Sequence, residues 1–270
     1  MIDAHFHIWQ LARGDYGWLT PAQGPIFRDI SLGDWRTVSR PCGITGGILV
    51  QAAPTAAETT FLLQQACGAD DVLGVVGWVD MLAPDVAARI EALAGNVKLK
   101  GLRPMLQDIA DPDWILQDAL RAAFAAMLNV GLTFDALVKP LHLPRILQLA
   151  KRYPALRIVI DHGGKPDIAG GQWQDWADDM QQLAQEPQVF CKLSGLWTEA
   201  EFGAEASVLD PYMRHIASCF GSDRTLWGSD WPVLERAGGY AEWQQSVDEM
   251  LAPPDRSAVF ETVARRAYGL

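Results

Sequence analysis

The sequence is poor in cysteine and in basic residues, and both scarcities exclude classes of protein. It has 4 cysteines among 270 residues, and none of them forms a Cys-X-X-Cys pair. Such scattered cysteines argue against a disulfide framework or a thiolate metal site, and we expect reduced thiols. Lys and Arg total 22 against 33 Asp and Glu, which gives a formal net charge of −11. An acidic chain without basic clusters argues against nucleic acid and anionic membranes as partners.

Long apolar runs and flexible linkers are also missing. No uninterrupted apolar stretch reaches the ~20 residues that a membrane-spanning helix requires, and Asp3 lies where a secretion signal would be apolar. We therefore expect a cytoplasmic protein that does not enter membranes. Because hydrophobic residues make up 49% of the chain and no Pro-, Gly- or Ser-rich linker divides it, we predict a single domain over residues 1–270. The sequence does not indicate an oligomeric state.

The chain does contain a regular alternation of short apolar or β-branched segments and longer amphipathic ones. The apolar segments predict eight strands, at residues 2–8, 44–52, 72–80, 97–106, 131–138, 156–164, 189–195 and 225–233. The amphipathic segments predict helices at residues 55–68, 84–95, 111–131, 143–154, 173–185, 205–221 and 254–270. Eight alternating units predict an α/β fold, a (β/α)₈ TIM barrel with parallel strands and right-handed crossovers. An open doubly wound sheet is the alternative, but no GxGxxG or Walker motif supports it.

Unusual polar residues lie where the predicted strands end, which is the face of a TIM barrel that carries chemistry. His5 and His7 are two apart on the first strand, so both rings should face one side and Phe6 the other. His162 ends the sixth strand in the segment Asp-His-Gly-Gly, and Asp230 ends the eighth. The first and eighth strands of a closed barrel are neighbours, so the carboxylate would lie beside imidazoles. We predict that these four residues form one catalytic cluster.

Other side chains near the predicted strand ends are candidates for substrate binding. The polar candidates are Arg103, Gln51, Asp80 and Lys165. Tryptophan presents a flat apolar face and a polar N–H, and most tryptophans pack in cores. The candidates near strand ends are Trp9 and Trp231, with Trp197 and Trp227 close by. Trp18 is a further candidate because it lies in the stretch from Gln10 to Ser31, which is long enough to form a lid over the barrel mouth.

The His-X-His pair on strand one, the histidine on strand six and the aspartate on strand eight resemble the amidohydrolase superfamily. The segments DAHFHIW, LKGLRPMLQ, DHGGKP, CKLSGLW, GSDWPV and YGL resemble its lactonase branch, which includes fuconolactonase- and rhamnonolactonase-like enzymes and 2-pyrone-4,6-dicarboxylate lactonases. The resemblance runs from residue 2 to 270. It implies a barrel hydrolase of carbohydrate catabolism that opens a cyclic ester with water.

Metal-bearing members of this superfamily commonly add a histidine or lysine from the fourth or fifth strand. The segments KGLRPML and LTFDALVKP place neither at an obvious ligand position, and His142 and His215 look structural. The resemblance therefore implies either one divalent ion, such as Zn²⁺, or catalysis without a metal. The ligands of such an ion would be His5, His7, His162 and Asp230. In both cases we expect Asp230 to take a proton from water while the ion or the imidazoles polarise the carbonyl.

A neutral sugar lactone of the L-fucono or L-rhamnono type is the favoured substrate. Only Arg103, Lys165 and Lys192 are expected near the mouth. These are few cations for binding the two carboxylates of a substrate such as 2-pyrone-4,6-dicarboxylate. Two other functions stay open: a metal-dependent decarboxylase of the same superfamily, and a sugar-binding barrel without turnover. Proton release from lactones, or carbon dioxide release from aromatic acids, distinguishes these alternatives.

Overall fold

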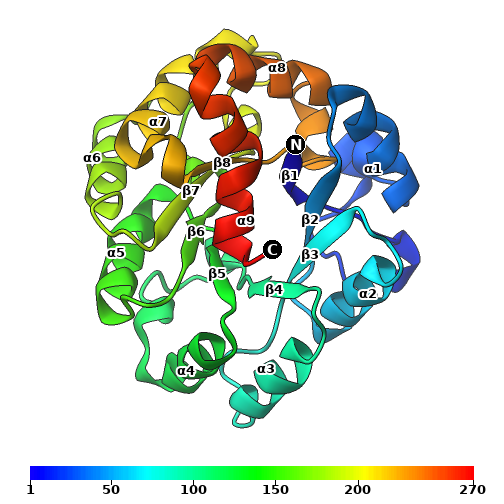
Figure 1. Cartoon of the computed structure of the whole chain (residues 1–270), viewed down its shortest axis with the longest axis vertical. Helices are drawn as coiled ribbons and strands as arrows, with labels where there is room; N and C mark the ends of the chain where they lie inside the picture. Colours follow the sequence, from blue (N-terminus) through cyan, green and yellow to red (C-terminus); the bar gives the residue numbers. More distant parts are fainter.

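Eight parallel strands form the wall of a barrel in the computed structural model, which describes residues 1–270 (Figure 1). The strands lie side by side in sequence order: β1 (Ile2–Phe6), β2 (Gly46–Val50), β3 (Val72–Gly77), β4 (Leu99–Leu102), β5 (Thr133–Ala136), β6 (Ile158–Ile160), β7 (Val189–Leu193) and β8 (Thr225–Trp227). The barrel closes at a bridge between Phe6 and Trp231, and His7 donates its backbone N–H to Trp231 O across the same seam. The predicted (β/α)₈ TIM barrel is confirmed.

Helices surround this wall on the outside (Figure 1). They are α1 (Leu32–Ser39), α2 (Ala56–Ala66), α3 (Val86–Ala94), α4 (Arg121–Val130), α5 (Leu143–Arg152), α6 (Gln174–Leu183), α7 (Asp210–Arg224) and α8 (Tyr240–Met250), while the last helix, α9 (Val263–Tyr268), lies elsewhere. Helix α2 begins after Thr55, whose hydroxyl accepts the Glu58 N–H at 3.0 Å. Helices α1 and α8 have no counterpart among the predicted segments, although a Ser31–Asp34 capping box opens α1.

Helix α9 lies across one end of the barrel, and Figure 1 looks onto this end. Its Tyr268 packs with side chains that fill the barrel interior, among them Val159 and Phe190. Thr133, at the start of β5, donates its hydroxyl to the Ala267 carbonyl at 2.6 Å. Since α9 covers the end where the strands begin, the opposite end, where they finish, is left for a site.

The segment from Gln10 to Ser31 follows β1 and folds over the strand ends. Tyr16 Oη donates to Glu58 Oε2 at 2.7 Å, and Trp18 Nε1 donates to Ala52 O at 2.7 Å. Both acceptors belong to the segment that follows β2. These contacts hold the long loop beside the end of β2, where Trp18 reaches the cavity described below.

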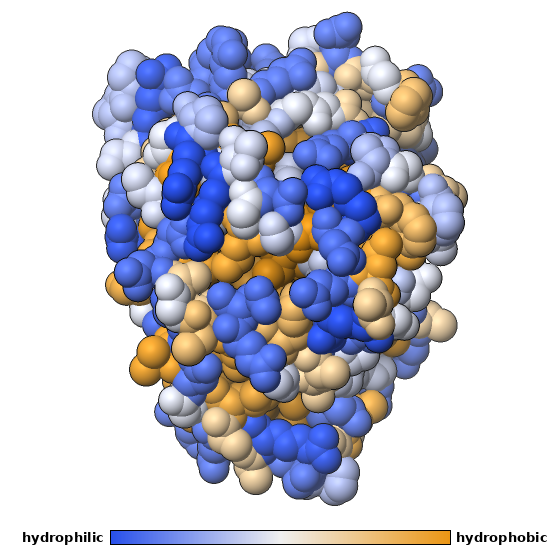
Figure 2. Space-filling view, turned by 90° about the vertical axis from the view of Figure 1, so that its right-hand side faces the viewer, coloured by the Kyte–Doolittle hydropathy of each residue, from blue (hydrophilic) through white to orange (hydrophobic).

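The side of the molecule that carries α1 and α2 has a mostly hydrophilic surface, with hydrophobic residues visible in the furrows between polar groups (Figure 2). Apolar side chains are buried between the strands and the helices, as where Phe6 stacks on Trp35 with ring centres 4.0 Å apart. None of the helices combines the length and the apolar composition that crossing a bilayer requires.

Candidate active site

A cavity of about 170 Å³ opens at the end of the barrel where the strands finish. Its lining combines imidazoles, carboxylates and cations with a few apolar side chains. The lining residues are His7, Trp18, Ala52, Arg103, Met105, Gln107, Asp108, Leu137, His162, Lys165, Asp230, Val233 and Arg236. The cavity is smaller than the ~300–1,000 Å³ of pockets for drug-sized ligands, so it suits a ligand of about one ring.

A β-bulge in β1 turns two histidines into the barrel. The pairing of β1 with β2 shifts register between Asp3 and Phe6. Asp3 and Phe6 face the helices, where both contact Trp35. His5 and His7 face the interior, where their Nε2 atoms lie 3.1 Å apart. The two histidines share a face as predicted, whereas the bulge breaks the alternation that would otherwise place Asp3 on the same face.

Left-handed backbone conformations aim His162 and Asp230 into the cavity. Their φ angles are +55° and +57°, a region that few non-glycine residues adopt. Strand β6 ends at Ile160, and residues 161–164 form a tight turn where the prediction extended the strand. Gly195 packs so closely on His162 that a Cβ there would lie 2.4 Å from its Nδ1. The imidazole is therefore held in place by a neighbouring backbone that tolerates only glycine.

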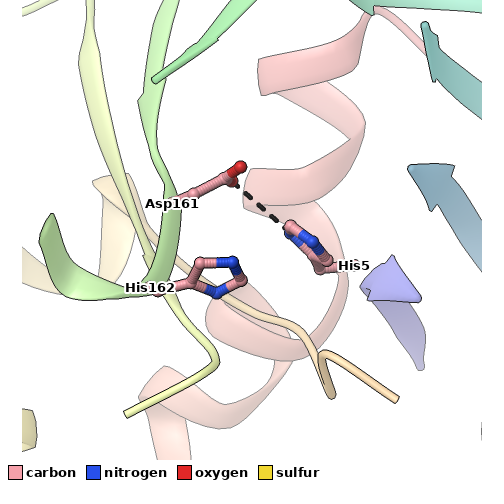
Figure 3. A group of neighbouring side chains, drawn as sticks. All are labelled: His5, Asp161 and His162. Atoms are coloured by element: carbon pink, nitrogen blue, oxygen red, sulfur yellow. Dashed lines mark ion pairs between the residues drawn. The ribbon is translucent and has the colours of Figure 1, made fainter. Parts of the chain in front are cut away.

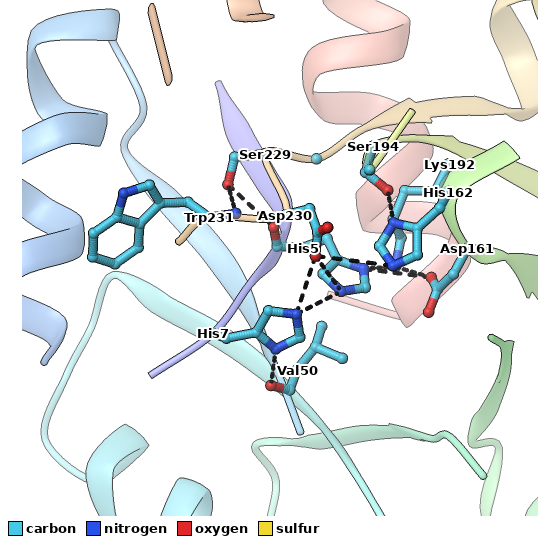
Figure 4. Close-up of polar contacts among 12 residues, drawn as sticks. His5, His7, Val50, Asp161, His162, Lys192, Ser194, Ser229, Asp230 and Trp231 are labelled. Carbon is cyan, nitrogen blue, oxygen red and sulfur yellow. Dashed lines mark hydrogen bonds and ion pairs between the residues drawn. The ribbon is translucent and has the colours of Figure 1, made fainter. Parts of the chain in front are cut away.

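The four residues of the predicted cluster meet in the structure (Figure 4). His7 Nε2 lies 3.2 Å from Asp230 Oδ1. The Nε2 atoms of His5 and His162 lie 3.6 and 3.9 Å from the same carboxylate oxygen. All four side chains are buried, yet His7, His162 and Asp230 line the cavity. Three imidazoles thus surround one carboxylate at the base of a small opening.

A fully buried ionic network lies beneath His5. Lys192 Nζ lies 2.7 Å from Asp161 Oδ1, 3.0 Å from Asp135 Oδ2 and 3.2 Å from His5 Nδ1. Tyr268 of α9 donates its hydroxyl to Asp135 Oδ2 at 2.6 Å. The expectation that Lys192 lies near the mouth is therefore wrong: it points inward from β7 because two buried carboxylates attract its charge.

The acceptor Val50 O sets the tautomer of His7. Val50 O accepts a hydrogen bond from His7 Nδ1 at 2.8 Å, so a neutral His7 leaves its Nε2 unprotonated. His5 lies between two cations that can only donate: Arg103 Nη1 is 3.2 Å from its Nε2, and Lys192 Nζ is 3.2 Å from its Nδ1. A neutral His5 ring can accept from only one of these two cations. The Nε2 lone pair of His7 is therefore available beside the cavity.

Burial favours neutral imidazoles at this site, while the carboxylate stays ionised. Burial lowers the pKa of His162 to about 4 and lowers the pKa of His5 well below its usual range, where the charge of Lys192 adds to the effect. Burial alone would raise the pKa of Asp230, but the neighbouring His162, His7 and His5 outweigh it and lower that pKa. At neutral pH the ionised Asp230 carboxylate therefore lies beside the neutral imidazoles of His5 and His162.

Two overlapping groups of side chains bring metal-binding atoms close together. In His5, His7 and Asp230 the donor atoms lie within 4.8 Å of one another, and two imidazole nitrogens with a carboxylate oxygen suit Zn²⁺. The other group is His5, Asp161 and His162 (Figure 3). There Asp161 is already paired with two cationic side chains, which leaves it less able to bind an ion. The first group fits a single divalent ion, and the unprotonated Nε2 of a neutral His7 is consistent with that fit.

The candidate substrate-binding side chains divide into two sets. Arg103, Lys165 and Trp18 line the cavity. Asp80 is exposed beyond β3 and lines a neighbouring groove. The sequence predicted a cluster of tryptophans at the mouth. This prediction is wrong, because Trp18 is the one tryptophan that lines the cavity.

Gln51, Trp9 and Trp231 do not line the cavity, which corrects their expected role. Each side chain donates its N–H within the protein: Gln51 Nε2 to Arg103 O at 2.8 Å, Trp9 Nε1 to Arg28 O at 2.7 Å and Trp231 Nε1 to Glu235 Oε1 at 2.6 Å. All three are buried, and these hydrogen bonds connect them to neighbouring segments of the protein. The sequence predicted them near the mouth from their positions along the strands. The direction of each side chain, however, depends on its hydrogen-bond partners.

Arg236 lines the cavity and was not among the predicted site residues. Arg103 and Lys165 are paired with Asp161 and Glu199, at 3.0 and 2.7 Å, whereas Arg236 has no carboxylate within ion-pair distance. Its place in the loop after β8, six residues beyond Asp230, is the signal in the sequence that would have identified it.

Comparison with known protein families matches residues 2–270 to the amidohydrolase family. An L-fucono-1,5-lactonase of Burkholderia ambifaria is 45% identical over 266 residues, covering 96% of this chain and 92% of that protein. An L-fucono-1,5-lactonase of Burkholderia multivorans is 36% identical, covering 100% of this chain and 96% of that protein. A crystal structure of an amidohydrolase from Burkholderia multivorans with bound zinc is 34% identical, covers 100% of this chain and 99% of that chain, and has a TM-score of 0.94.

Proposed function

The chain belongs to the amidohydrolase family, and from this premise we propose that it hydrolyses the lactone of a neutral sugar. The resemblance to the lactonase branch noted in the sequence is confirmed by its relatives. The observation that carries the proposal is the ionised Asp230 carboxylate, held among three imidazoles in a cavity of one-ring size. An L-fucono-1,5-lactone type of substrate is favoured, because two relatives similar to nearly the whole chain carry that name.

The charges around the cavity support a neutral lactone better than a dicarboxylate. Arg103 and Lys165 are each paired with a carboxylate of the protein, which leaves Arg236 as the unpaired cation of the lining. A single free guanidinium suits the one carboxylate that forms when a lactone opens. Asp108 also lines the cavity and would repel a second carboxylate.

In the proposed reaction, Asp230 accepts a proton from a water molecule as the water oxygen attacks the lactone carbonyl. Arg103 and Arg236, both in the cavity lining, donate hydrogen bonds to the oxyanion that forms. The ring C–O bond then breaks, and the proton held by Asp230 returns to the departing alkoxide. A carboxylate with a lowered pKa is a weak base, but an activated cyclic ester needs less assistance than an amide does. The product is a hydroxy acid that ionises at neutral pH.

His162 is the histidine best placed to assist the leaving oxygen. Its ring lines the cavity, and its Nδ1 lies 2.9 Å from Ser194 Oγ, which fixes the ring orientation. His5 and His7 lie beside Asp230, with their Nε2 atoms 3.6 and 3.2 Å from its Oδ1. A divalent ion, when bound, would be held by His5, His7 and Asp230 and would polarise the lactone carbonyl. Zinc titration should saturate at one ion per chain, and two ions would contradict this assignment.

A panel of aldonolactones tests the proposal directly. Proton release in a weakly buffered indicator should report hydrolysis of L-fucono-, L-rhamnono- and D-glucono-1,5-lactone, with the L-fucono compound fastest. Carbon dioxide release from aromatic acids is measured in parallel. Release of carbon dioxide without lactone hydrolysis would replace the proposal with the decarboxylase alternative.

The Asp230→Asn variant tests the role of the carboxylate. An amide cannot accept the proton of water, so we expect kcat to fall by roughly 10²–10⁴-fold, the range that general acid–base catalysis supplies. Asp118→Asn is the control, because Asp118 is exposed and does not line the cavity, so this variant should keep full activity. Circular dichroism and the thermal midpoint check that Asp230→Asn folds. Near-normal turnover of the best lactone by Asp230→Asn would end the assignment.

A further inference from the structure

A second hollow of about 580 Å³ lies beside the catalytic cavity and is formed by loops that follow β1 to β4. It shares Trp18, Met105 and Asp108 with the cavity, so the two spaces are adjacent. We call this hollow the lateral groove. Trp78 and Trp114 add two further indole rings to its lining. The reaction proposed above uses none of this groove.

The two tryptophans Trp78 and Trp114 differ from most others in this protein. Trp18 and Trp231, for example, donate their indole N–H to protein oxygens at 2.7 and 2.6 Å. Trp78 and Trp114 are half-buried, and neither indole N–H has an acceptor within the protein. A tryptophan usually satisfies its N–H when it packs into a core. These two rings therefore present both a flat face and a free donor to whatever fills the groove.

The charged residues of the groove differ from those of the cavity. Asp15, Asp80 and Asp108 are its charged lining residues, and neither lysine nor arginine lines it. Asp15 Oδ2 is paired with Arg13, but its Oδ1 has no hydrogen-bond partner in the protein. The cavity, in contrast, has both signs of charge in its lining, with three cations beside Asp108 and Asp230. A carboxylate would thus be repelled from the groove, whereas hydroxyl groups would find acceptors there.

We propose that the lateral groove is a subsite for a pyranose ring attached to the lactone through a glycosidic bond. Flat apolar faces, free indole donors and carboxylate acceptors together match a neutral ring that carries hydroxyl groups. Because Trp18 and Met105 line both spaces, a molecule whose lactone ring lies in the cavity would have its attached ring beside the groove. The substrate class then includes aldonolactones that carry a glycosyl group, such as those made by oxidising a disaccharide. This inference rests on the proposed function for the lactone end alone.

Two measurements test the groove. The first compares kcat/KM for lactobiono- and maltobiono-1,5-lactone with that for D-glucono-1,5-lactone, the same lactone ring without a glycosyl group. The second measures binding of lactitol and maltitol, which have no lactone, by isothermal titration calorimetry. We expect saturable binding of at least one alditol, and a higher kcat/KM for the corresponding glycosylated lactone.

Trp78→Ala and Trp114→Ala should each weaken alditol binding by roughly tenfold, as loss of a contact tryptophan does. The same variants should lower the ratio of glycosylated to unsubstituted kcat/KM by a similar factor. Trp173→Ala is the matched control, since Trp173 is also half-buried but contacts Trp176 and Tyr212 on the helical shell. It should change neither quantity.

The outcomes separate the groove from the lactone site. Absence of saturable alditol binding, or equal binding in wild type and both groove variants, overturns the groove assignment. Alditol binding that depends on Trp78 and Trp114, in a protein that opens no lactone of either kind, leaves the groove as a sugar site and overturns the proposed function. A thermal midpoint for each variant confirms that it is folded.

Discussion

His162, Lys165 and Asp230 are the non-glycine residues of this chain with positive φ, and all of them line the cavity. Such backbone angles cost roughly 1–3 kcal/mol each and persist where surrounding contacts impose them. Asp230 is held by its own backbone N–H, which donates to His5 O at 2.8 Å, and His162 by the neighbouring Gly195. At the scale of the residue, the unusual conformations therefore coincide with the proposed chemistry.

Glu58 is a second residue in an unusual environment. It lies on α2 beneath the long loop, where it accepts hydrogen bonds from Tyr16 Oη and from Ala52 N and lies 3.3 Å from Arg13. Burial raises the pKa of Glu58 to about 7, and these neighbours offset the rise only in part. The folded protein therefore binds this proton more tightly than the unfolded chain does, whose glutamates have a pKa near 4.3.

We predict that this glutamate makes stability fall as pH rises. The stabilisation from the tightly bound proton is complete below about pH 4 and is lost as pH rises through about 7, on the order of 3 kcal/mol in total. Urea unfolding of wild type and Glu58→Gln between about pH 5 and pH 8 measures the effect, since the amide does not titrate. Parallel stability curves for the two proteins would contradict the prediction.

At the scale of the element, Asp3 joins the first and last strands. Its carboxylate accepts hydrogen bonds from Ser229 N at 2.8 Å, from Ser229 Oγ at 2.7 Å and from Tyr240 Oη at 2.8 Å. Trp35 Nε1 of α1 donates to the same group at 3.1 Å. One side chain thus connects β1, the turn after β8 and two outer helices. The turn that it holds carries Asp230.

The Asp3→Asn variant should weaken the connection between β1 and the turn after β8. An amide nitrogen would face donors that now point at a carboxylate, and buried donors left unpaired cost about 2–4 kcal/mol together. We expect a lower free energy of unfolding and a lower kcat, because Asp230 loses the support of its turn. Asp85→Asn, at an exposed helix start, is the control and should resemble wild type in both respects. Wild-type stability in Asp3→Asn would show that the connection between β1 and the turn after β8 does not depend on the charge of Asp3.

At the scale of the whole molecule, Lys192 connects parts of the barrel that are far apart in sequence. Its contacts reach Asp135 on β5, Asp161 after β6 and His5 on β1, and Tyr268 of α9 adds a hydrogen bond to Asp135. Burial alone would lower the pKa of Lys192, but the two carboxylates outweigh it and raise that pKa. The cation therefore stays charged in the centre of the barrel.

Replacing Lys192 with methionine should be strongly destabilising. The change leaves the buried Asp135 without a cation and Asp161 with Arg103 alone, and breaking a buried pair in this way costs about 3–5 kcal/mol. Denaturant unfolding at neutral pH measures the loss. Lys151→Met, on an exposed position of α5, controls for the change of side chain and should unfold like wild type. A loss as small as that of the control would mean that the network does not stabilise the fold.

The strands and most helices were predictable because they depend on local patterns. The alternation of apolar segments and Gly-terminated amphipathic segments, such as the one ending at Gly131, arises within windows of about 10–20 residues. Helix α8 was missed even though it runs from Tyr240 to Met250. Trp9 and Trp231 were assigned to substrate because their strand position was visible but their hydrogen-bond partners were not.

By itself the sequence determined the barrel and the residue types at the ends of its strands, because periodicity and turn residues act between near neighbours. The tertiary structure decided which of those side chains meet. His7 and Asp230, 223 positions apart, come within 3.2 Å only because β8 closes against β1. The bulge that turns His5 inward, the burial that keeps His162 neutral and the groove beside Trp78 all depend on that closure. Each is set by packing between distant segments, and a linear pattern does not record packing.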